Sequence, residues 1–465
     1  MSRREHAARS EAERQFAQAP VGSLVAQYAV PAVVSLLVNS LYNIVDQVFI
    51  GQGVGFLGNA ATNVSFPLVS VTMALGLLLG VGCSANFSLR LGERRKELAA
   101  QCVGNSLTLQ IITGAVLLIG CMTFLEPLLR AFGATDTVLP YALEYTRITL
   151  LGTPMVLVGL GLSNVIRADG SARYVMWISV AGALLNTVLD PIFIFPWGLN
   201  MGVAGAAWAT VISQALVFAL TIAYLPRFQC IHFTLSCMAL KLSVVRRVLT
   251  LGASSLLNHL TLVLVQITVN NSVVHYGALS VYGADIPLAV MGIVMKVNQI
   301  LMSLVIGISI GAQPIMGFNY GAQNFRRVVQ TYKTALAAAT CCAAGAFFMF
   351  QTFPAHIVSL FGKENPLYME YAVKTFRVFL FMCFTAGVQV ITTGYFQGTG
   401  RPLRAIVLTL TQRMLFFIPL MLLLPLRFGL DGVLLTGPVS DSAALTVTLF
   451  SVVPDLKRLI RLETD

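Results

Sequence analysis

The sequence from Gly82 to Gly92, GCSANFSLRLG, has a counterpart about 229 residues later, the sequence from Gly311 to Gly321, GAQPIMGFNYG. Each stretch begins and ends on a glycine and leads into a charged loop. A match at glycines is informative because apolar residues, which fill most of this chain, match by chance. We therefore interpret the chain as an internal duplication.

A second match at about the same offset supports the duplication. Arg167–Ser171, RADGS, corresponds to Gln397–Arg401, QGTGR. Two prolines correspond as well: Pro191 and Pro196 in the first half, and Pro419 and Pro425 in the second. A duplicated unit that is strongly apolar is typical of a membrane transporter built from two similar lobes.

The composition indicates a membrane protein. Hydrophobic residues make up 57% of the chain, charged residues make up 11%, and the mean hydropathy is +0.80. A soluble domain carries about a quarter charged residues, and a membrane crossing needs roughly 20 apolar ones. Twelve spans are predicted: 24–50, 59–85, 99–124, 138–165, 174–196, 202–226, 248–275, 286–315, 329–352, 372–396, 404–426 and 430–453.

The even number of spans determines how the two halves are related. With six spans each, both halves enter the bilayer from the same side, so the repeats are parallel. The sequence thus predicts an all-α integral membrane protein, with twelve transmembrane helices in two parallel six-helix lobes related by a pseudo-two-fold axis along the membrane normal. The expected parts are a cytoplasmic N-terminal segment (1–20), a first lobe (21–226), a cytoplasmic linker (227–247), a second lobe (248–453) and a cytoplasmic tail (454–465).

The net charge of +11 follows from topology rather than from a nucleic-acid site. Basic residues concentrate in alternate loops and in both terminal segments, for example at Arg90, Arg94, Arg95, Lys96, Arg246 and Arg247. The positive-inside rule then places both termini in the cytoplasm, and the loops against anionic lipids. Residues 1–19 lack the apolar core of a signal peptide, so we expect the first span to direct insertion.

Several function classes are excluded by missing patterns. The eight cysteines are scattered through the spans, which favours packing over disulfides or a metal site. No Gly-x-x-x-x-Gly-Lys-[Ser/Thr] loop occurs, and neither does a His-x-x-x-His metal pattern. We expect neither an enzyme nor a bound cofactor, and ATP is not the predicted energy source.

Two acidic residues in the first lobe form the principal candidate site. Asp46 and Asp190 lie in outward-running spans, roughly 7 to 9 Å from the outer ends by helix geometry. A charged side chain inside a membrane helix costs about 2.5 to 3.5 kcal/mol, so such residues are functional candidates. Asn186 lies one turn below Asp190 on the same helix face, Asn39 lies two turns below Asp46, and Thr210 in the next span comes to a comparable depth. Carboxylates flanked by amides predict a site for a proton or for Na⁺ at Asp46 and Asp190.

The second lobe has a different set of charges. Lys296, Arg413 and Asp441 each lie about ten residues from a predicted membrane boundary, close to the midplane. Buried opposite charges persist when they are paired, so the sequence predicts an ion-paired cluster of these three residues. His259 and Gln266 are candidates to join them, although a lone histidine is more often a hydrogen-bonded interior residue than a proton relay.

Several of these segments together resemble one known family. They are Pro31, Tyr42–Asp46 with Ile50 and Gly51, Arg167–Gly170, Asp190 with Pro191, Gly311–Ala322 and Gln397–Gly400. The chain is similar over nearly its whole length to the multidrug and toxic compound extrusion (MATE) family, and most to its bacterial MepA-like branch. The resemblance implies efflux of amphipathic, mostly cationic compounds in exchange for H⁺ or Na⁺, with the acidic site at Asp46, Asn186 and Asp190. Other branches of the family carry a Glu or Asp in span 7, 8 or 10. Here spans 7 and 10 have no acidic residue, and span 8 has only Asp285 near its outer edge.

Two functions stay open from the sequence. The first is the multidrug antiporter, for which the expected partners are small-molecule drugs or toxic cations, H⁺ or Na⁺, and membrane lipids, with the protein a monomer. The alternative is a flippase for a lipid-linked precursor, which a strongly cationic central cavity would favour.

Overall fold

The computed structural model describes residues 11–283, 285–359 and 366–464, and these residues are almost entirely helical. Residues 1–10 of the predicted N-terminal segment lie outside the described residues. The first half contains α2 (Glu11–Gln18), α3 (Val21–Gly53), α4 (Phe56–Gly92), α5 (Lys96–Thr123), α6 (Leu125–Ala131), α7 (Leu139–Leu151), α8 (Thr153–Ala168), α9 (Ala172–Ile194) and α10 (Gly202–Ile222). The second half contains α11 (Leu242–Ala278), α12 (Asp285–Gly321), α13 (Phe325–Thr352), α14 (Pro354–Ser359), α15 (Pro366–Phe379), α16 (Ala386–Gly398), α17 (Pro402–Leu410), α18 (Ile418–Phe428) and α19 (Leu430–Thr464).

The predicted spans agree with the structure in number and order. Within the described residues, 11 helices are long and apolar enough to cross a membrane. The number rises to 12 if α7 and α8, which form a bent pair, are counted together as one span. This confirms the predicted fold class. The span predicted at 138–165 is bent in the structure, because α7 and α8 meet at Gly152 at an angle of 49°. Pro154 follows in the first turn of α8, where its missing N–H is tolerated but the preceding helix cannot continue.

The second lobe contains two further interruptions within predicted spans. The short 3₁₀ helix η3 (Cys383–Thr385) separates α15 from α16, and the π-helix η4 (Thr411–Phe417) separates α17 from α18. Pro419 lies just after η4 and cannot donate a backbone hydrogen bond to the preceding turn. Hydrophobic periodicity predicts the apolar run but not these local changes of helix type.

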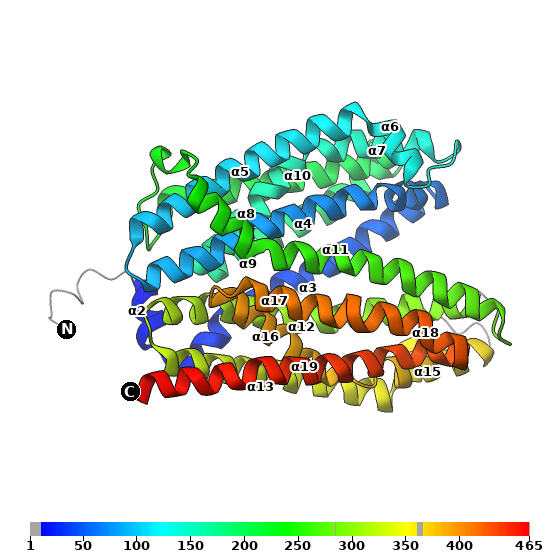
Figure 1. The fold of residues 1–465 in the computed structure, drawn as a ribbon. Helices are drawn as coiled ribbons and strands as arrows, with labels where there is room; N and C mark the ends of the chain where they lie inside the picture. The colour runs from blue at the N-terminus through cyan, green and yellow to red at the C-terminus, as the bar shows by residue number, and fades with distance from the viewer. Residues whose placement is uncertain (1–10, 284, 360–365, 465) are drawn as a thin grey trace.

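The helices form two groups that are joined by α3 and α11 (Figure 1). Helix α3 packs against α9 of the first half and α12 of the second, whereas α11 packs against α4 of the first half and α17 of the second. In the duplicated unit α3 is equivalent to α11, and α4 is equivalent to α12. The contact of α3 with α12 is therefore equivalent to the contact of α11 with α4, as a pseudo-two-fold relation requires. Helix α2 and the last turns of α19 lie at the same end of the bundle (Figure 1), which we call the termini-bearing end.

Repeat-equivalent glycines make equivalent contacts between the two groups. A side chain at Gly311 would collide with the backbone of α3 at Ala29, and one at Gly82 would collide with the backbone of α11 at Val248 and Gly252. Gly92 and Gly321 meet each other: a Cβ added to Gly321 would lie 3.2 Å from the Cα of Gly92. Residues without side chains let these helices approach closely, which explains why the glycines repeat in the sequence.

The segment between α10 and α11 is fastened to the first group of helices. It contains the 3₁₀ helices η1 (Leu225–Arg227) and η2 (Leu235–Met238). The fully buried Asn105 of α5 donates hydrogen bonds to the carbonyl oxygens of Cys237 (3.1 Å) and Ala239 (3.0 Å), and it accepts one from the N–H of Lys241 (2.7 Å). The segment is therefore part of the first group rather than a loose tether. The predicted linker limits of 227 and 247 stay a prediction.

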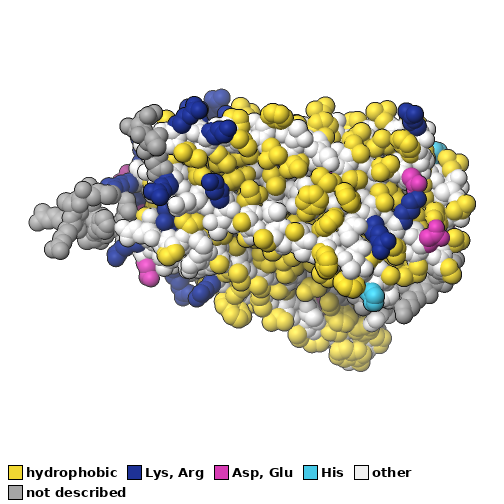
Figure 2. Space-filling view, turned by 90° about the horizontal axis from the view of Figure 1, so that it is seen from below, with side chains coloured by type: hydrophobic (Ala, Val, Ile, Leu, Met, Phe, Trp, Pro, Cys, Tyr) yellow, Lys and Arg dark blue, Asp and Glu magenta, His cyan; other side chains and the backbone are white. Residues whose placement is uncertain are grey.

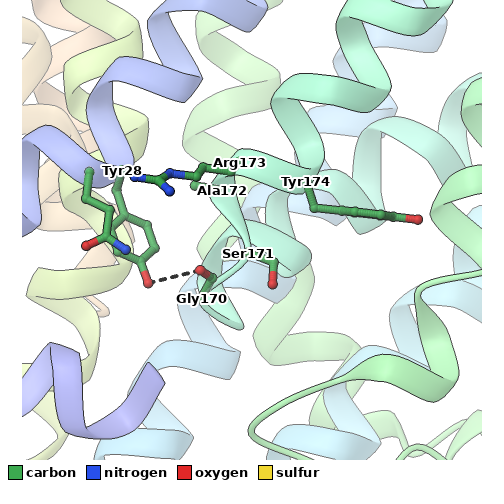
Figure 3. Close-up of a pocket in the computed structure, with 7 residues that line it drawn as sticks. Tyr28, Gly170, Ser171, Ala172, Arg173 and Tyr174 are labelled. Carbon is green, nitrogen blue, oxygen red and sulfur yellow. Dashed lines mark hydrogen bonds between the residues drawn. The ribbon is translucent and has the colours of Figure 1, made fainter. Parts of the chain in front are cut away.

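Asp169 provides the second attachment. Its buried carboxylate accepts hydrogen bonds from the backbone N–H groups of Gln229 (2.7 Å) and Cys230 (2.9 Å) and from the hydroxyl of Tyr224 (2.8 Å). Burial raises the pKa of Asp169 to about 6, although these donors act in the opposite direction. In the adjacent pocket the Tyr28 hydroxyl points to Gly170 and donates to its carbonyl oxygen at 3.2 Å (Figure 3).

Charged side chains are distributed unevenly over the surface. In Figure 2 most of the lysine and arginine side chains gather at the termini-bearing end, while the long flank of the molecule is largely apolar. An apolar face of this kind suits contact with the hydrocarbon of a bilayer. The side of the membrane that the termini occupy stays a prediction.

Candidate functional site

Asp46 and Asp190 meet inside the first lobe. Asp46 projects from α3 and Asp190 from α9, and their side chains are 8% and 0% exposed. The two carboxyl groups are within hydrogen-bonding reach of each other. One oxygen of each, Oδ1 of Asp46 and Oδ2 of Asp190, has no hydrogen-bond partner among the described residues. Unpartnered buried oxygens are rare in proteins, so this pair is unusual.

Asn186 belongs to the same group. It lies one turn before Asp190 on α9, is 1% exposed, and its Nδ2 donates to Asp190 Oδ1 at 3.4 Å. Its own Oδ1 has no partner among the described residues. Asn39 and Thr210 are only half-buried, and the structure records no hydrogen bond from either side chain to the carboxyl groups. Equal depth along a helix does not ensure that side chains point toward one another.

Two tyrosines beside the acids were missed by the sequence reasoning. Tyr42, one turn before Asp46 on α3, and Tyr145 on α7 both lie close enough to Asp46 and Asp190 to interact with their charge. The spacing of Tyr42 from Asp46 could have indicated that they share a helix face. Nothing in the sequence indicates Tyr145, because it reaches the site through packing of α7.

The oxygen atoms of this site suit the binding of a proton or of a small hard cation. Asp46 Oδ1, Asp190 Oδ2 and Asn186 Oδ1 are three buried acceptor oxygens without partners among the described residues. Hard cations bind oxygen ligands, and a shared proton would bridge two carboxyl groups. Either ligand would remove repulsion between the two charges.

In the second lobe, Arg413 and Asp441 are brought together but do not form a close ion pair. They lie close enough to interact electrostatically, yet no N to O distance between them is 4.0 Å or less. Asp441 Oδ1 instead accepts from Gln412 Nε2 at 3.4 Å, and Arg413 donates to the carbonyl oxygen of Asn258 at 3.4 Å. His259 lies close enough to feel the charge of Arg413.

Lys296 does not join this cluster, and the predicted three-residue ion pair is wrong in this respect. Its side chain is exposed and makes no ion pair with a described residue. The prediction used depth alone, whereas the direction of a side chain around the helix axis decides its neighbours. Gln266 also stays apart, because its Nε2 donates to Asn270 on the exposed face of α11 (2.9 Å).

The two lobes touch through α3 and α12. On α3 and α12, the hydroxyls of Ser40 and Ser303 share a hydrogen bond of 3.2 Å. Closer to the termini, Gly307 faces Val33 at backbone contact. Farther from the termini both helices expose side chains: Leu41, Asn43 and Ile44 on α3, and Leu288, Lys296, Gln299 and Ile300 on α12.

A family model described as MatE matches the chain twice, at residues 31–192 and 254–423. The chain belongs to the MatE family. The two MatE segments fall one in each half, as expected for a duplicated unit. The chain is similar to multidrug export protein MepA of Staphylococcus haemolyticus (24% identical over 442 residues) and to that of Staphylococcus aureus strain MSSA476 (23%), in both cases over 94% of each chain.

Several solved transporter structures have the same fold as this chain. A MATE transporter in an outward-facing conformation superposes with a TM-score of 0.89 at 23% identity, covering 96% of this chain and 98% of that one. A MATE structure in the bent conformation gives 0.89 at 22% identity, covering 98% and 100%. A transporter from Pyrococcus furiosus, described as having a binding pocket of reverse polarity, gives 0.88 at 23%, covering 96% and 98%.

Proposed function

We propose that this MatE protein is a secondary active multidrug antiporter, which exports amphipathic, mostly cationic compounds in exchange for H⁺ or Na⁺. Family membership and the similarity to multidrug export proteins support export of small molecules. The single observation that supports ion coupling is the group of three unpartnered buried oxygens of Asp46, Asn186 and Asp190. We expect the protein to act as a monomer.

The proposed orientation places both termini in the cytoplasm of a bacterial cell. It rests on the lysine and arginine side chains that gather at the termini-bearing end (Figure 2). In this orientation the exposed positions of α3 and α12 that are farther from the termini lie toward the outer side of the membrane.

The proposed coupling mechanism depends on the charge of Asp46 and Asp190. A ligand drives a conformational change only if it binds one state better than the other. A proton or Na⁺ on Asp46 and Asp190 would remove their repulsion and let α3 and α9 pack more closely. Pro31 in α3 and Pro191 in α9 interrupt the backbone hydrogen bonds of these helices, so the helices can bend there. Closer packing would narrow the space that holds the exported compound.

The mechanism predicts competition between the exported compound and the coupling ion. We expect the affinity for a cationic dye such as ethidium to fall as pH falls or as Na⁺ rises. Asp46→Asn should mimic the ion-bound state and bind the dye weakly under all conditions. A wild-type affinity that ignores both pH and Na⁺ would place the coupling site elsewhere.

The decisive test of the function is transport in proteoliposomes. With an imposed pH gradient, addition of ethidium should collapse the gradient if H⁺ is the coupling ion. The same measurement with a Na⁺ gradient at equal pH distinguishes Na⁺ coupling. If neither the pH gradient nor the Na⁺ gradient drives transport of any compound tested, the antiporter is refuted.

A further inference from the structure

Helix α2 precedes the first membrane span and lies at the termini-bearing end of the molecule (Figure 1). It has only 8 residues. An isolated helix of this length is not stable in water, because it makes too few hydrogen bonds to offset the cost of forming its first turn. Its residues Ala12, Glu13 and Phe16 are buried against other helices. The helical form of α2 therefore depends on these neighbours.

The first lobe contacts α2 through an ion pair and an aromatic pair. Glu13, which is 3% exposed, has its Oε2 atom 3.0 Å from Nζ of Lys96 at the start of α5. The Phe16 ring packs against the ring of Tyr28 on α3, with 5.2 Å between the two centroids. Both contacts lie on the buried side of α2. They attach the helix to two different parts of the first lobe.

The second lobe contacts the C-terminal end of the same helix. The carbonyl oxygen of Phe16 accepts hydrogen bonds from Nε of Arg327 on α13 (2.8 Å) and from Nδ2 of Asn319 on α12 (3.1 Å). Arg327 also donates to the carbonyl oxygen of Ala19, just after α2 ends. The last carbonyl oxygens of a helix have no partner within it and carry partial negative charge, so a guanidinium group is favourable there.

Phe16 is the residue at which both lobes meet α2. Its ring contacts Tyr28 of the first lobe and also Phe318 of α12, with 5.5 Å between the centroids of the second pair. If the lobes move apart at the termini-bearing end, α2 can keep its contacts with only one of them. Only Ala19 and Pro20 separate α2 from α3, so α2 has to stay with the first lobe. The contacts with α12 and α13 are then the ones that break.

We propose that α2 is a clasp, which holds the two lobes together at the termini-bearing end and has to leave the second lobe before that end can open. A transporter with alternating access opens each end in turn, so such a contact sets how often this end opens. The proposed function does not include this role, because the clasp lies outside the acidic site and binds neither the coupling ion nor the exported compound.

Arg327→Gln tests the clasp, because it removes the charge that joins α2 to the second lobe. Arg326→Gln is the matched control. Arg326 is the neighbouring residue on α13 and carries the same charge, but it is exposed and makes no hydrogen bond or ion pair with a described residue. Arg327→Lys keeps the charge and loses the planar fork of donors, so it should restore part of the wild-type behaviour.

The first measurement is the reaction of Ser88→Cys with a water-soluble maleimide in lipid nanodiscs, corrected for native cysteines. Ser88 on α4 is 2% exposed, and its Cβ lies 3.0 Å from the position that a Cβ added to Gly317 of α12 would take. It is therefore covered where the lobes meet. Arg327→Gln should speed its labelling by about tenfold, roughly the value of one charge-assisted hydrogen bond. Arg326→Gln should label at the wild-type rate.

The second measurement is amide hydrogen exchange of residues 12–19 in the same samples, which reports whether α2 is released. We expect faster exchange in Arg327→Gln and wild-type exchange in Arg326→Gln. Faster exchange without faster labelling overturns the clasp, because α2 then leaves without opening this end. Unchanged exchange in Arg327→Gln overturns it too, as does an equal effect of both substitutions. Neither measurement requires transport, so a failure to move any compound in proteoliposomes would refute the antiporter separately.

Discussion

The carboxyl group of Asp46 on α3 lies within hydrogen-bonding reach of the carboxyl group of Asp190 on α9, and both are buried in the first lobe. The two residues are far apart in sequence, so the fold alone brings them together. Two negative charges this close repel one another unless a proton or a cation is shared between them.

Neutralising either acid should therefore uncouple transport. We expect Asp46→Asn and Asp190→Asn each to abolish ion-driven dye efflux while the protein still reaches the membrane, because losing a buried charge lowers the insertion cost. The measurement is dye efflux from cells at matched expression. Asp136→Asn, an exposed acid that pairs with Arg130, is the control and should retain efflux. Normal efflux in both buried variants would contradict the assignment.

The close contact at Gly82 should hold the termini-bearing end shut. Gly82→Leu would collide with the backbone of α11, which we expect to cost the arrangement of the lobes in this structure about 1 to 3 kcal/mol. Labelling of Asn43→Cys by a membrane-impermeant maleimide, corrected for native cysteines, should then fall. Gly120→Leu is the control, since a side chain there meets nothing within 4 Å. Undiminished labelling in Gly82→Leu would show that this contact does not control opening.

The second-lobe cluster should matter for stability rather than coupling. Asp441→Asn leaves the positive charge of Arg413 without its nearest opposite charge. Breaking a buried ion pair costs about 3 to 5 kcal/mol, and we expect less here because the two groups are not in direct contact. The melting temperature in detergent should fall while efflux by the remaining folded protein persists. Full stability with no efflux would instead make Asp441 a second coupling site.

Asp169 should give the protein a pH-dependent stability. Its pKa of about 6 in the folded protein lies above the ordinary value of 3.8, so the native state binds this proton more tightly than the unfolded chain. The free energy of unfolding should consequently decrease as pH rises from about 4 to 6, and this contribution should be constant above pH 6. Thermal unfolding across this range is the measurement. Asp169→Asn should lack the slope, and an identical slope in the variant would mean that another group titrates.

The sequence predicts the architecture well because membrane spans and repeat glycines leave strong local signals. Gly82 and Gly311 repeat because each sits against a neighbouring backbone, and this constraint can be read directly from the spacing. Helix interruptions are less predictable. The bend at Gly152 and the π-helix at Thr411–Phe417 depend on packing as well as on nearby prolines, and an apolar run does not reveal either.

The sequence predicts those site residues whose burial in a membrane is energetically costly. Asp46 and Asp190 stand out because a buried acid in a membrane is expensive, and Asn186 follows from its spacing on the same helix face. Counting residues from the membrane boundary did not predict the neighbours of Lys296. Such a count gives the position of a side chain along the membrane normal but not its direction around the helix axis. Tyr145 could not be found, since only the packed arrangement of α7 brings it to the acids.

A residue near the two-fold axis of a homodimer meets its own copy, and the contact between Gly92 and Gly321 reproduces that situation within one chain. Such an interface is isologous, so an ancestral six-helix protein could have paired with itself through the helix that became α4 and α12. In that dimer every side chain would occur in both subunits. Gene fusion freed the copies to diverge, and one half now carries Asp46 and Asp190 while the other carries Arg413 and Asp441.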